Sequence, residues 1–188
     1  MYNTDNIFIE QLRRGERNAC QRLVSDYGYA VFQMVRRIVV RQEDAEEVYQ
    51  DVFVKALQGI GNYDSRKASL ATWLNRIAYH EALNFVRKRH PNIVYMEEGT
   101  SYERRMTNDD DFNDTLDEDA HDSQTIQALE NAMEKLPPHE QAIVTMFYYD
   151  DMSLADIAYV TGSIPTTVGS QLCRIRKKLY RIIKTTHL

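Results

Sequence analysis

The stretch Ser153–Arg181, SLADIAYVTGSIPTTVGSQLCRIRKKLYR, predicts two helices joined by a tight turn. Ser153 can cap the first helix, because its hydroxyl can accept a hydrogen bond from a free backbone N–H group. Gly162 permits the turn, and Pro165 suits the first position of the second helix. Apolar residues then recur every three or four positions, at Val168, Leu172, Ile175, Leu179 and Ile182. This pattern is typical of a DNA-binding helix-turn-helix; the alternative is a solvated helical hairpin with a basic tail.

The second of these helices carries the side chains expected to contact DNA. No acidic residue follows Ile157, whereas six basic residues do. Polar residues near the start of such a helix reach base edges, and the later basic residues suit phosphate groups. The candidate residues are Thr166, Thr167, Ser170, Gln171, Arg174, Arg176, Lys177, Lys178 and Arg181.

The composition of the 188 residues is that of a folded protein, with 43% hydrophobic and 27% charged residues. These values exclude a wholly disordered, collagen-like or membrane-spanning chain, and the seven Gly and four Pro favour helix over sheet. Two cysteines, Cys20 and Cys173, cannot build a disulfide framework or a thiolate metal site. The first residues have no basic segment followed by an apolar one, so we expect no signal peptide and a cytoplasmic location.

The net charge of −5 is unevenly distributed along the chain. Residues 91–123 contain eleven acidic and two basic residues, whereas the flanking segments are slightly basic. The acidic segment has no hydrophobic period and cannot bury enough apolar surface to offset its ordering entropy. We therefore predict an all-α fold, with small helical domains at 1–90 and 124–188 joined by an acidic flexible linker at 91–123.

The N-terminal domain is predicted to contain helices at 6–12, 19–39, 43–58 and 69–88, each with an apolar stripe. The helix 43–58 presents a polar face formed by Asp44, Glu47, Gln50 and Asp51. The last helix and the residues before it mix aromatic and basic side chains, which is what single-stranded DNA requires for stacking and phosphate pairing. These candidates are Tyr63, Trp73, Arg76, Tyr79, His80, Asn84, Arg87 and Lys88. For Trp73 the alternative is a place in the core, since it lies on the apolar stripe.

The order and spacing of these segments resemble the extracytoplasmic-function (ECF) group of bacterial sigma factors. Residues 44–53, DAEEVYQDVF, resemble the helix of that family that binds core RNA polymerase, and residues 69–78, SLATWLNRIA, resemble its promoter-melting helix. Leu136-Pro137-Pro138 before an apolar helix, and Ser153–Ala158 followed by Thr167, Val168 and Ser170, are typical of the family's fourth region.

The resemblance implies a transcription initiation factor that binds core RNA polymerase and directs it to promoter DNA. Domain 1–90 is expected to bind the polymerase and to recognise and melt the −10 element, and domain 124–188 to recognise the −35 element. The linker is expected either to thread the polymerase channels or to act as a solubilising spacer. An anti-sigma factor is an expected partner, which would place the chain near the nucleoid or, through that partner, near the membrane. We expect no membrane insertion and no small-molecule substrate.

Three residues depart from the family pattern. Gly169 and Gln171 stand where basic residues are usual in the recognition helix, and His80 replaces the commonest residue, Asn. Gln171 can still read adenine through two hydrogen bonds. These departures affect the expected promoter preference but not the role of either helix.

The sequence shows no enzyme signature. There is no phosphate-binding loop, nucleophile elbow or dinucleotide fingerprint, and the five histidines are dispersed. We therefore expect no catalytic activity, no cofactor and no metal site. Two alternatives to a sigma factor are a helix-turn-helix regulator that binds duplex DNA by itself, and a polymerase-binding adaptor that does not read DNA.

Overall fold

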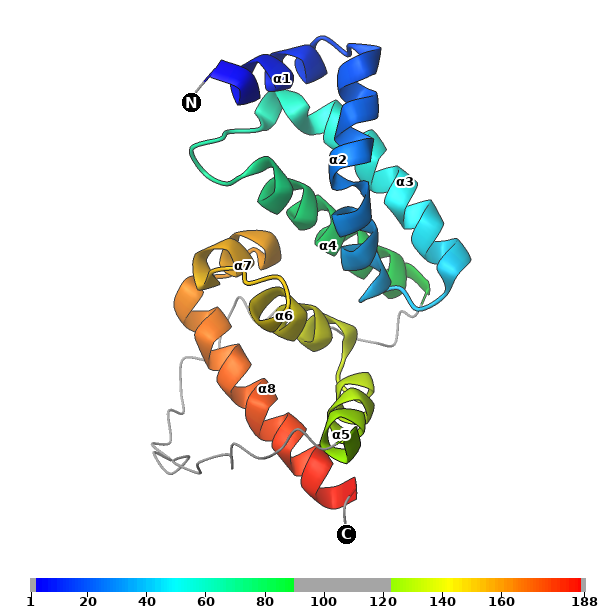
Figure 1. Cartoon of the computed structure of the whole chain (residues 1–188), viewed down its shortest axis with the longest axis vertical. Helices are drawn as coiled ribbons and strands as arrows, with labels where there is room; N and C mark the ends of the chain where they lie inside the picture. The colour runs from blue at the N-terminus through cyan, green and yellow to red at the C-terminus, as the bar shows by residue number, and fades with distance from the viewer. Residues whose placement is uncertain (1–2, 90–122, 187–188) are drawn as a thin grey trace.

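The computed structural model describes residues 3–89 and 123–186, and within them it contains helices and no strand. The predicted all-α class is therefore confirmed. The predicted acidic linker lies outside the described residues, apart from its last residue, Ser123, which begins a helix. The described helices form two groups that follow one another along the chain (Figure 1).

The first group consists of four helices around one core. Helices α2, α3 and α4 pack against one another, and α1 contacts α2 and the short 3₁₀ turn η1. Fully buried side chains such as Leu23, Met34, Val52 and Leu74 come from the three packed helices. The elements are α1 (Asn3–Arg13), α2 (Arg17–Arg36), α3 (Gln42–Gly59), η1 (Ile60–Asn62) and α4 (Leu70–Arg89).

The second group is organised by its longest helix, which contacts the three others. Met146, Ile157, Val160 and Val168 are fully buried between them. The elements are α5 (Ser123–Glu134), α6 (Pro138–Tyr148), α7 (Leu154–Thr161) and α8 (Pro165–Thr186). Within the described residues, no helix is both long enough and apolar enough to cross a membrane.

The predicted caps of the helix-turn-helix are confirmed. The Ser153 hydroxyl accepts a hydrogen bond from the Asp156 backbone N–H at 3.1 Å, which satisfies one of the free donors at the start of α7. Gly162 ends α7 in the left-handed region at φ 76°, a conformation that costs glycine nothing. Pro165 then begins α8. These local rules fix the angle at which α8 leaves α7.

One helix is shorter than its apolar period predicts. Ile38 and Val39 continue the spacing of α2, but α2 ends at Arg36; Ile38 lies in the turn that follows, and Val39 comes directly after that turn. They are nevertheless buried, with 1% and 3% of their surfaces exposed. Spacing identified the buried residues correctly but not the end of the helix, because a turn can deliver side chains to the same core.

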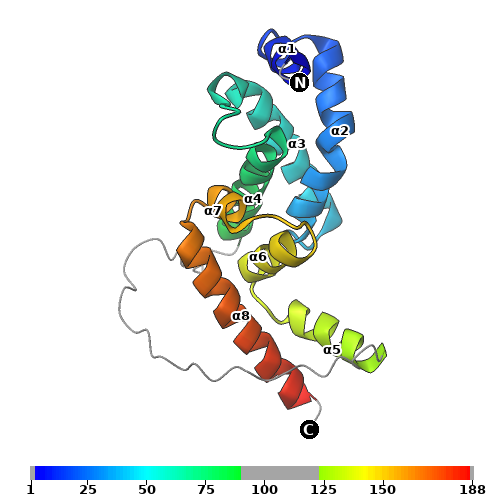
Figure 2. The ribbon, with the colours of Figure 1, turned by 60° about the vertical axis from the view of Figure 1, so that its left-hand side comes forward.

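The two groups touch through α4 and α7, which lie side by side in both ribbon views (Figure 2). The Arg76 guanidinium on α4 donates to the backbone carbonyl of Tyr159 on α7, and it lies 4.9 Å from the centroid of that tyrosine ring. Arg37, at the end of α2, binds Asp150 through two hydrogen bonds of 2.6 and 2.9 Å. The helix-turn-helix thus rests against the helix predicted to melt promoter DNA.

Candidate nucleic-acid interface

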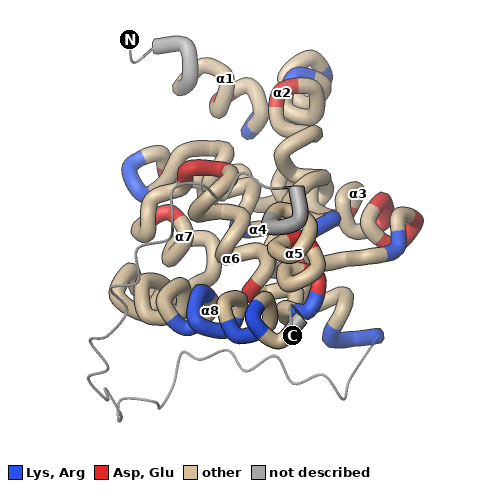
Figure 3. Tube along the Cα trace, turned by 60° about the horizontal axis from the view of Figure 1, so that its bottom comes forward, with Lys and Arg blue, Asp and Glu red and all other residues tan. Residues whose placement is uncertain are grey.

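Helix α8 divides into a buried side and a basic side. Val168, Leu172, Ile175 and Leu179 are buried against α5, α6 and α7. Lys and Arg follow one another along the helix beyond its first turns (Figure 3). An amphipathic second helix with a basic outer face is the geometry that enters a major groove.

The structure places the predicted α8 candidates at different depths. Thr166, Ser170, Arg174, Arg176 and Arg181 are exposed, whereas the rest are half-buried, namely Thr167, Gln171, Lys177 and Lys178.

Two of the half-buried side chains are not fully available to DNA. Lys178 binds Glu140 of α6 at 2.8 Å, so this cation also links α8 to α6. The Gln171 Oε1 atom is buried, and within the described residues it has no hydrogen-bond partner. Because its Oε1 atom is buried, the Gln171 side chain must turn outward to read a base. Leaving an acceptor buried and unpaired is costly, which favours that turn.

The outer face of α8 also contains residues that the sequence did not single out. Cys173 is exposed and follows Leu172, and Tyr180 is 39% exposed. The Lys184 ammonium lies 6.0 Å from the Tyr180 ring centroid. Tyr180 falls between basic positions of the helix, and Cys173 directly precedes the first of them; that spacing was the only signal in the sequence.

The aromatic candidates of the first group separate into core and surface. Tyr63 and Tyr79 are 8% and 5% exposed and belong to the core. The Tyr63 hydroxyl donates to the Ala68 carbonyl at 3.1 Å, and its ring centroid lies 5.4 Å from that of Trp73. Trp73 is half-buried and packs against the core. Both tyrosines therefore support the helix from within.

A shallow hollow of about 390 Å³ brings three of the α4 candidates together. Trp73, Arg76 and His80 line it, and α7 contributes Tyr159. Its rim also includes Asn62, Lys55 and Glu81, which sequence reasoning did not select. Aromatic and cationic groups around a hollow can stack an unpaired base and hold the adjoining phosphate.

The remaining α4 candidates lie toward the end of the helix. Asn84 is half-buried, and Arg87 and Lys88 are exposed in the last turn. Before α4, Arg66 donates both side-chain and backbone hydrogen bonds to Asp64, and these lower the pKa of that carboxyl from 3.8 to about 2. The loop that leads into α4 is thus held by a charge-assisted turn.

The four polar candidates on α3 differ in their surroundings. Asp44 is only 8% exposed, and its carboxylate accepts a hydrogen bond of 2.6 Å from Arg89 at the end of α4. Glu47, Gln50 and Asp51 are exposed. Val54, which is 53% exposed, lies one turn further on the same face. The exposed face of α3 is therefore mainly acidic and polar, with the apolar Val54 and the basic Lys55.

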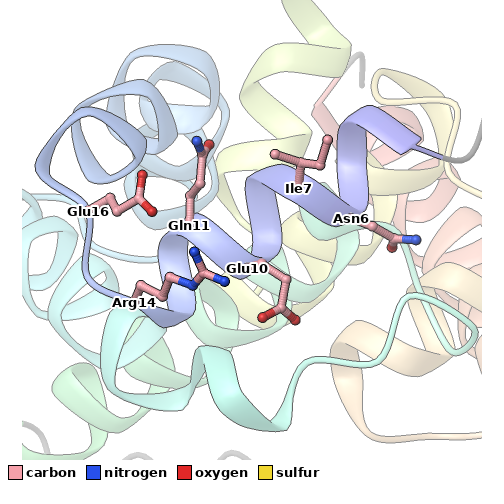
Figure 4. A pocket seen from close by; sticks show the side chains of 6 residues that line it. All are labelled: Asn6, Ile7, Glu10, Gln11, Arg14 and Glu16. Atoms are coloured by element: carbon pink, nitrogen blue, oxygen red, sulfur yellow. The ribbon is translucent and has the colours of Figure 1, made fainter.

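Other parts of the described chain offer little chemistry. A hollow of about 340 Å³ beside α1 is lined by Asn6, Ile7, Glu10, Gln11, Arg14 and Glu16 (Figure 4). Its side chains come from a single helix and the turn after it, and they converge on no common point. Across residues 3–89 and 123–186, no three His, Cys, Asp or Glu side chains gather in a way that could hold a metal ion.

Family models match both helical groups. The Sigma-70 region 2 model matches residues 23–91, and the Sigma-70, region 4 model matches residues 126–179. The chain belongs to the sigma-70 family. The two matches together span most of the chain and appear in the order that the sequence motifs predicted, so the resemblance to bacterial sigma factors is confirmed.

Curated relatives, among them an ECF sigma factor, extend over nearly the whole length of this sigma factor. It is 25% identical over 182 residues to the ECF RNA polymerase sigma factor SigW of Bacillus subtilis, covering 94% of this chain and 95% of the relative. It is 28% identical over 191 residues to the RNA polymerase sigma-H factor of Pseudomonas aeruginosa, covering 96% and 94%. The chain is therefore a transcription initiation factor that directs RNA polymerase to promoters, and a stand-alone regulator is not favoured.

Solved structures share the fold of this sigma factor. CnrH, in its complex with the cytosolic domain of CnrY, superposes with a TM-score of 0.64 at 22% identity, covering 96% of this chain and 97% of the other. RpoE of Bartonella quintana, in complex with the anti-sigma factor NepR, gives a TM-score of 0.60 at 18% identity, covering 87% and 96%. Both comparisons establish the two-part helical architecture.

Proposed function

We propose that this sigma factor uses three surfaces: α3 for core RNA polymerase, α4 for the −10 element and α8 for the −35 element. The observation that carries the proposal is that one chain combines a basic outer face on α8 with the aromatic and cationic hollow on α4. The first suits duplex DNA and the second suits an unpaired base. The division into 1–90, the linker 91–123 and 124–188 is part of this proposal.

On α8, exposed residues near the start are assigned to bases and later cations to phosphates. Thr166, Ser170 and Arg174 lie on the exposed side of the first turns. Arg174 suits guanine, which offers two acceptors in the major groove. Phosphate contacts are assigned to the cations further along the helix, at Arg176, Lys177, Lys178 and Arg181, with Lys184 added from the structure.

On α4, the hollow lined by Trp73, Arg76 and His80 is assigned to the unpaired −10 base. Trp73 offers a ring face, and Arg76 offers a cation beside it. Extruding a base costs a few kcal/mol, which such stacking can offset. Tyr63 and Tyr79 support the site from the core, and the last part of the helix, with Asn84, Arg87 and Lys88, lies where the strand would continue.

On α3, we assign Glu47, Gln50 and Asp51 to the polymerase, together with Val54. These side chains are exposed on one face, and none of them is used by the core. Asp44 is assigned a positioning role, because its carboxylate holds the end of α4 through Arg89.

Regulation and location follow from the same assignment. CnrH and RpoE are each in complex with another protein, and for RpoE that protein is an anti-sigma factor; we propose an anti-sigma factor as a partner of this chain also. The chain then acts in the cytoplasm at the nucleoid, without catalysing a reaction and without a cofactor. Any proximity to the membrane comes through the partner.

The experiment that tests the proposal mixes the purified protein with bacterial core RNA polymerase and maps start sites on a genomic library of upstream regions. Defined starts that share two spaced elements support the assignment. Binding to duplex DNA without any interaction with polymerase overturns it in favour of an independent regulator. Binding to polymerase without defined start sites also overturns it, in favour of a polymerase-binding adaptor that does not read DNA.

Two variants test the surfaces separately. We expect Arg174→Ala to cost about 1–3 kcal/mol at one promoter position; an equal loss on all sequences would make Arg174 a phosphate contact. We expect Asp51→Lys to weaken polymerase binding without unfolding the protein. Glu134→Lys, which makes the same charge change on exposed α5, is the control. Equal binding of core enzyme by both charge variants contradicts the assignment of α3.

A further inference from the structure

The hollow on α4 is shared between the two helical groups. Its lining comes from α3, η1 and α4, except for Tyr159, which belongs to α7 of the helix-turn-helix. The Tyr159 ring lies over the Arg76 guanidinium at 4.9 Å. Resting over a guanidinium is also how an unpaired base would bind, since nucleic-acid bases stack on arginine in the same way.

The backbone of α7 occupies Arg76 as well. The Arg76 guanidinium donates to the Tyr159 carbonyl, which is a neutral oxygen in the place where a phosphate oxygen would accept. At the same edge, an ideal Cβ on Gly162 would lie 3.9 Å from His80 Cε1, so the end of α7 reaches a second residue of the hollow. In this arrangement Arg76 and His80 face protein rather than DNA.

A separate contact holds the groups together away from the hollow. Arg37 and Asp150 form an ion pair with two hydrogen bonds, and their side chains are 20% and 31% exposed. Arg37 follows α2, and Asp150 lies in the turn between α6 and α7. The next residue, Asp151, adopts φ 49°, an uncommon conformation for a residue other than glycine. The turn therefore presents Asp150 in one defined geometry.

We propose that Tyr159 is an internal competitor of the promoter base. In the free chain its ring and carbonyl engage Arg76 at the wall of the α4 hollow, and the Arg37–Asp150 pair helps to keep α7 there. Binding of the −10 strand requires α7 to leave. This inference rests on the proposed assignment of the hollow to the −10 base, and it adds an autoinhibitory contact within the chain.

Trp73 provides a direct readout, because it is the chain's only tryptophan and it lines the hollow. In the free full-length protein, we expect Tyr159→Ala and Arg37→Glu to shift Trp73 emission to longer wavelength and to increase its quenching by acrylamide. Tyr159→Phe keeps the ring and should behave like the wild type. Arg17→Glu, which makes the same charge change on exposed residue 17 at the other end of α2, is the matched control.

The ion pair is tested by exchanging its charges. Arg37→Asp combined with Asp150→Arg should return Trp73 to wild-type quenching, whereas each single change should not. Small-angle scattering should show a larger radius of gyration only for the opened variants. Far-ultraviolet circular dichroism verifies that each variant remains folded. Unchanged Trp73 quenching in folded Arg37→Glu and Tyr159→Ala proteins overturns the proposal.

DNA binding then separates this inference from the proposed function. The probe is a fluorescein-labelled single strand carrying the −10 sequence found by start-site mapping. We expect the opened variants to bind it about tenfold more tightly than the free wild type, which corresponds to an open form rising from about a tenth of molecules to nearly all. If Trp73 becomes exposed but strand binding is unchanged, the competitor role is refuted, and the hollow is not the −10 site although the two groups do separate.

Discussion

Asp44 and Asp51 lie two turns apart on α3, and we predict that they have different roles. Replacing Asp44 by Asn should lower the free energy of unfolding, whereas replacing Asp51 by Asn should leave it nearly unchanged and weaken polymerase binding. The side chain of Asp44 is 12% exposed and pairs with Arg89, which is 45% exposed. Asp51 is exposed, and the part of the chain that the structure describes gives it no ion-pair partner.

The expected magnitude follows from the surroundings of the Asp44–Arg89 pair. A hydrogen bond to a charged group contributes about 1.5–3 kcal/mol, and an exposed ion pair only about 0–1 kcal/mol. Arg89 is half-exposed and regains water when the pair is broken, so the value falls between these limits. Asp44 also lies in the first turn of α3, where the helix dipole adds about 0.3–1 kcal/mol. We expect a loss of about 1–2 kcal/mol.

Urea unfolding followed by circular dichroism measures this loss for Asp44→Asn, for Arg89→Gln and for the double variant. The double variant should lose less than the sum of the two single variants, because both remove the same contact. Additive losses would show that the pair does not stabilise the fold. Normal stability of Asp44→Asn together with lost polymerase binding would refute the reasoning and make Asp44 a direct polymerase contact.

Three further predictions concern local structure. An ideal Cβ on Gly28 would lie 2.7 Å from the Tyr49 hydroxyl, so Gly28→Ala should destabilise the wild type. In a Tyr49→Phe protein, which lacks that hydroxyl, the same change should stabilise the helix by about 0.5–1 kcal/mol. Thermal melts with and without Gly28→Ala in each background test this. Ser153→Ala removes the cap of α7 and should cost about 1 kcal/mol, whereas Ser153→Asp should retain most stability in urea titrations. Arg66 lowers the pKa of Asp64 to about 2, so the contribution of Asp64 to the free energy of unfolding is present above pH 4 and is lost as the pH falls toward 2. Asp64→Asn should flatten the dependence of the free energy of unfolding on pH only between about pH 4 and pH 2. A dependence parallel to that of the wild type in this range would exclude the contribution.

The features that the sequence predicted correctly are those set by near neighbours. The cap at Ser153, the turn at Gly162 and the start of α8 at Pro165 each depend on a few adjacent residues. Apolar spacing likewise identified the buried side of α8. Such patterns can be read in sequence because capping and helical periodicity act over one or two turns.

The features that the sequence did not reveal depend on distant partners. Asp44 is buried because Arg89, 45 residues later, reaches it. Tyr79 is in the core although its neighbour His80 lines the hollow, and only the packing of α4 against α2 and α3 separates the two. Charge and residue type could not distinguish Asp44 from Asp51, since both are acids on the same amphipathic helix.

The polar contacts between the two groups are individually weak. The Arg37–Asp150 pair is half-exposed, and such pairs contribute on the order of 1 kcal/mol. The Arg76–Tyr159 contact adds about 0.5–2 kcal/mol. Direct packing of α4 against α7 within one hydrophobic cluster adds to these two polar contacts. Moving an equilibrium from 99:1 to 1:99 takes roughly 5.5 kcal/mol. We therefore expect a polymerase to release α7 from α4 when its preference for the open form exceeds the stability of the closed form.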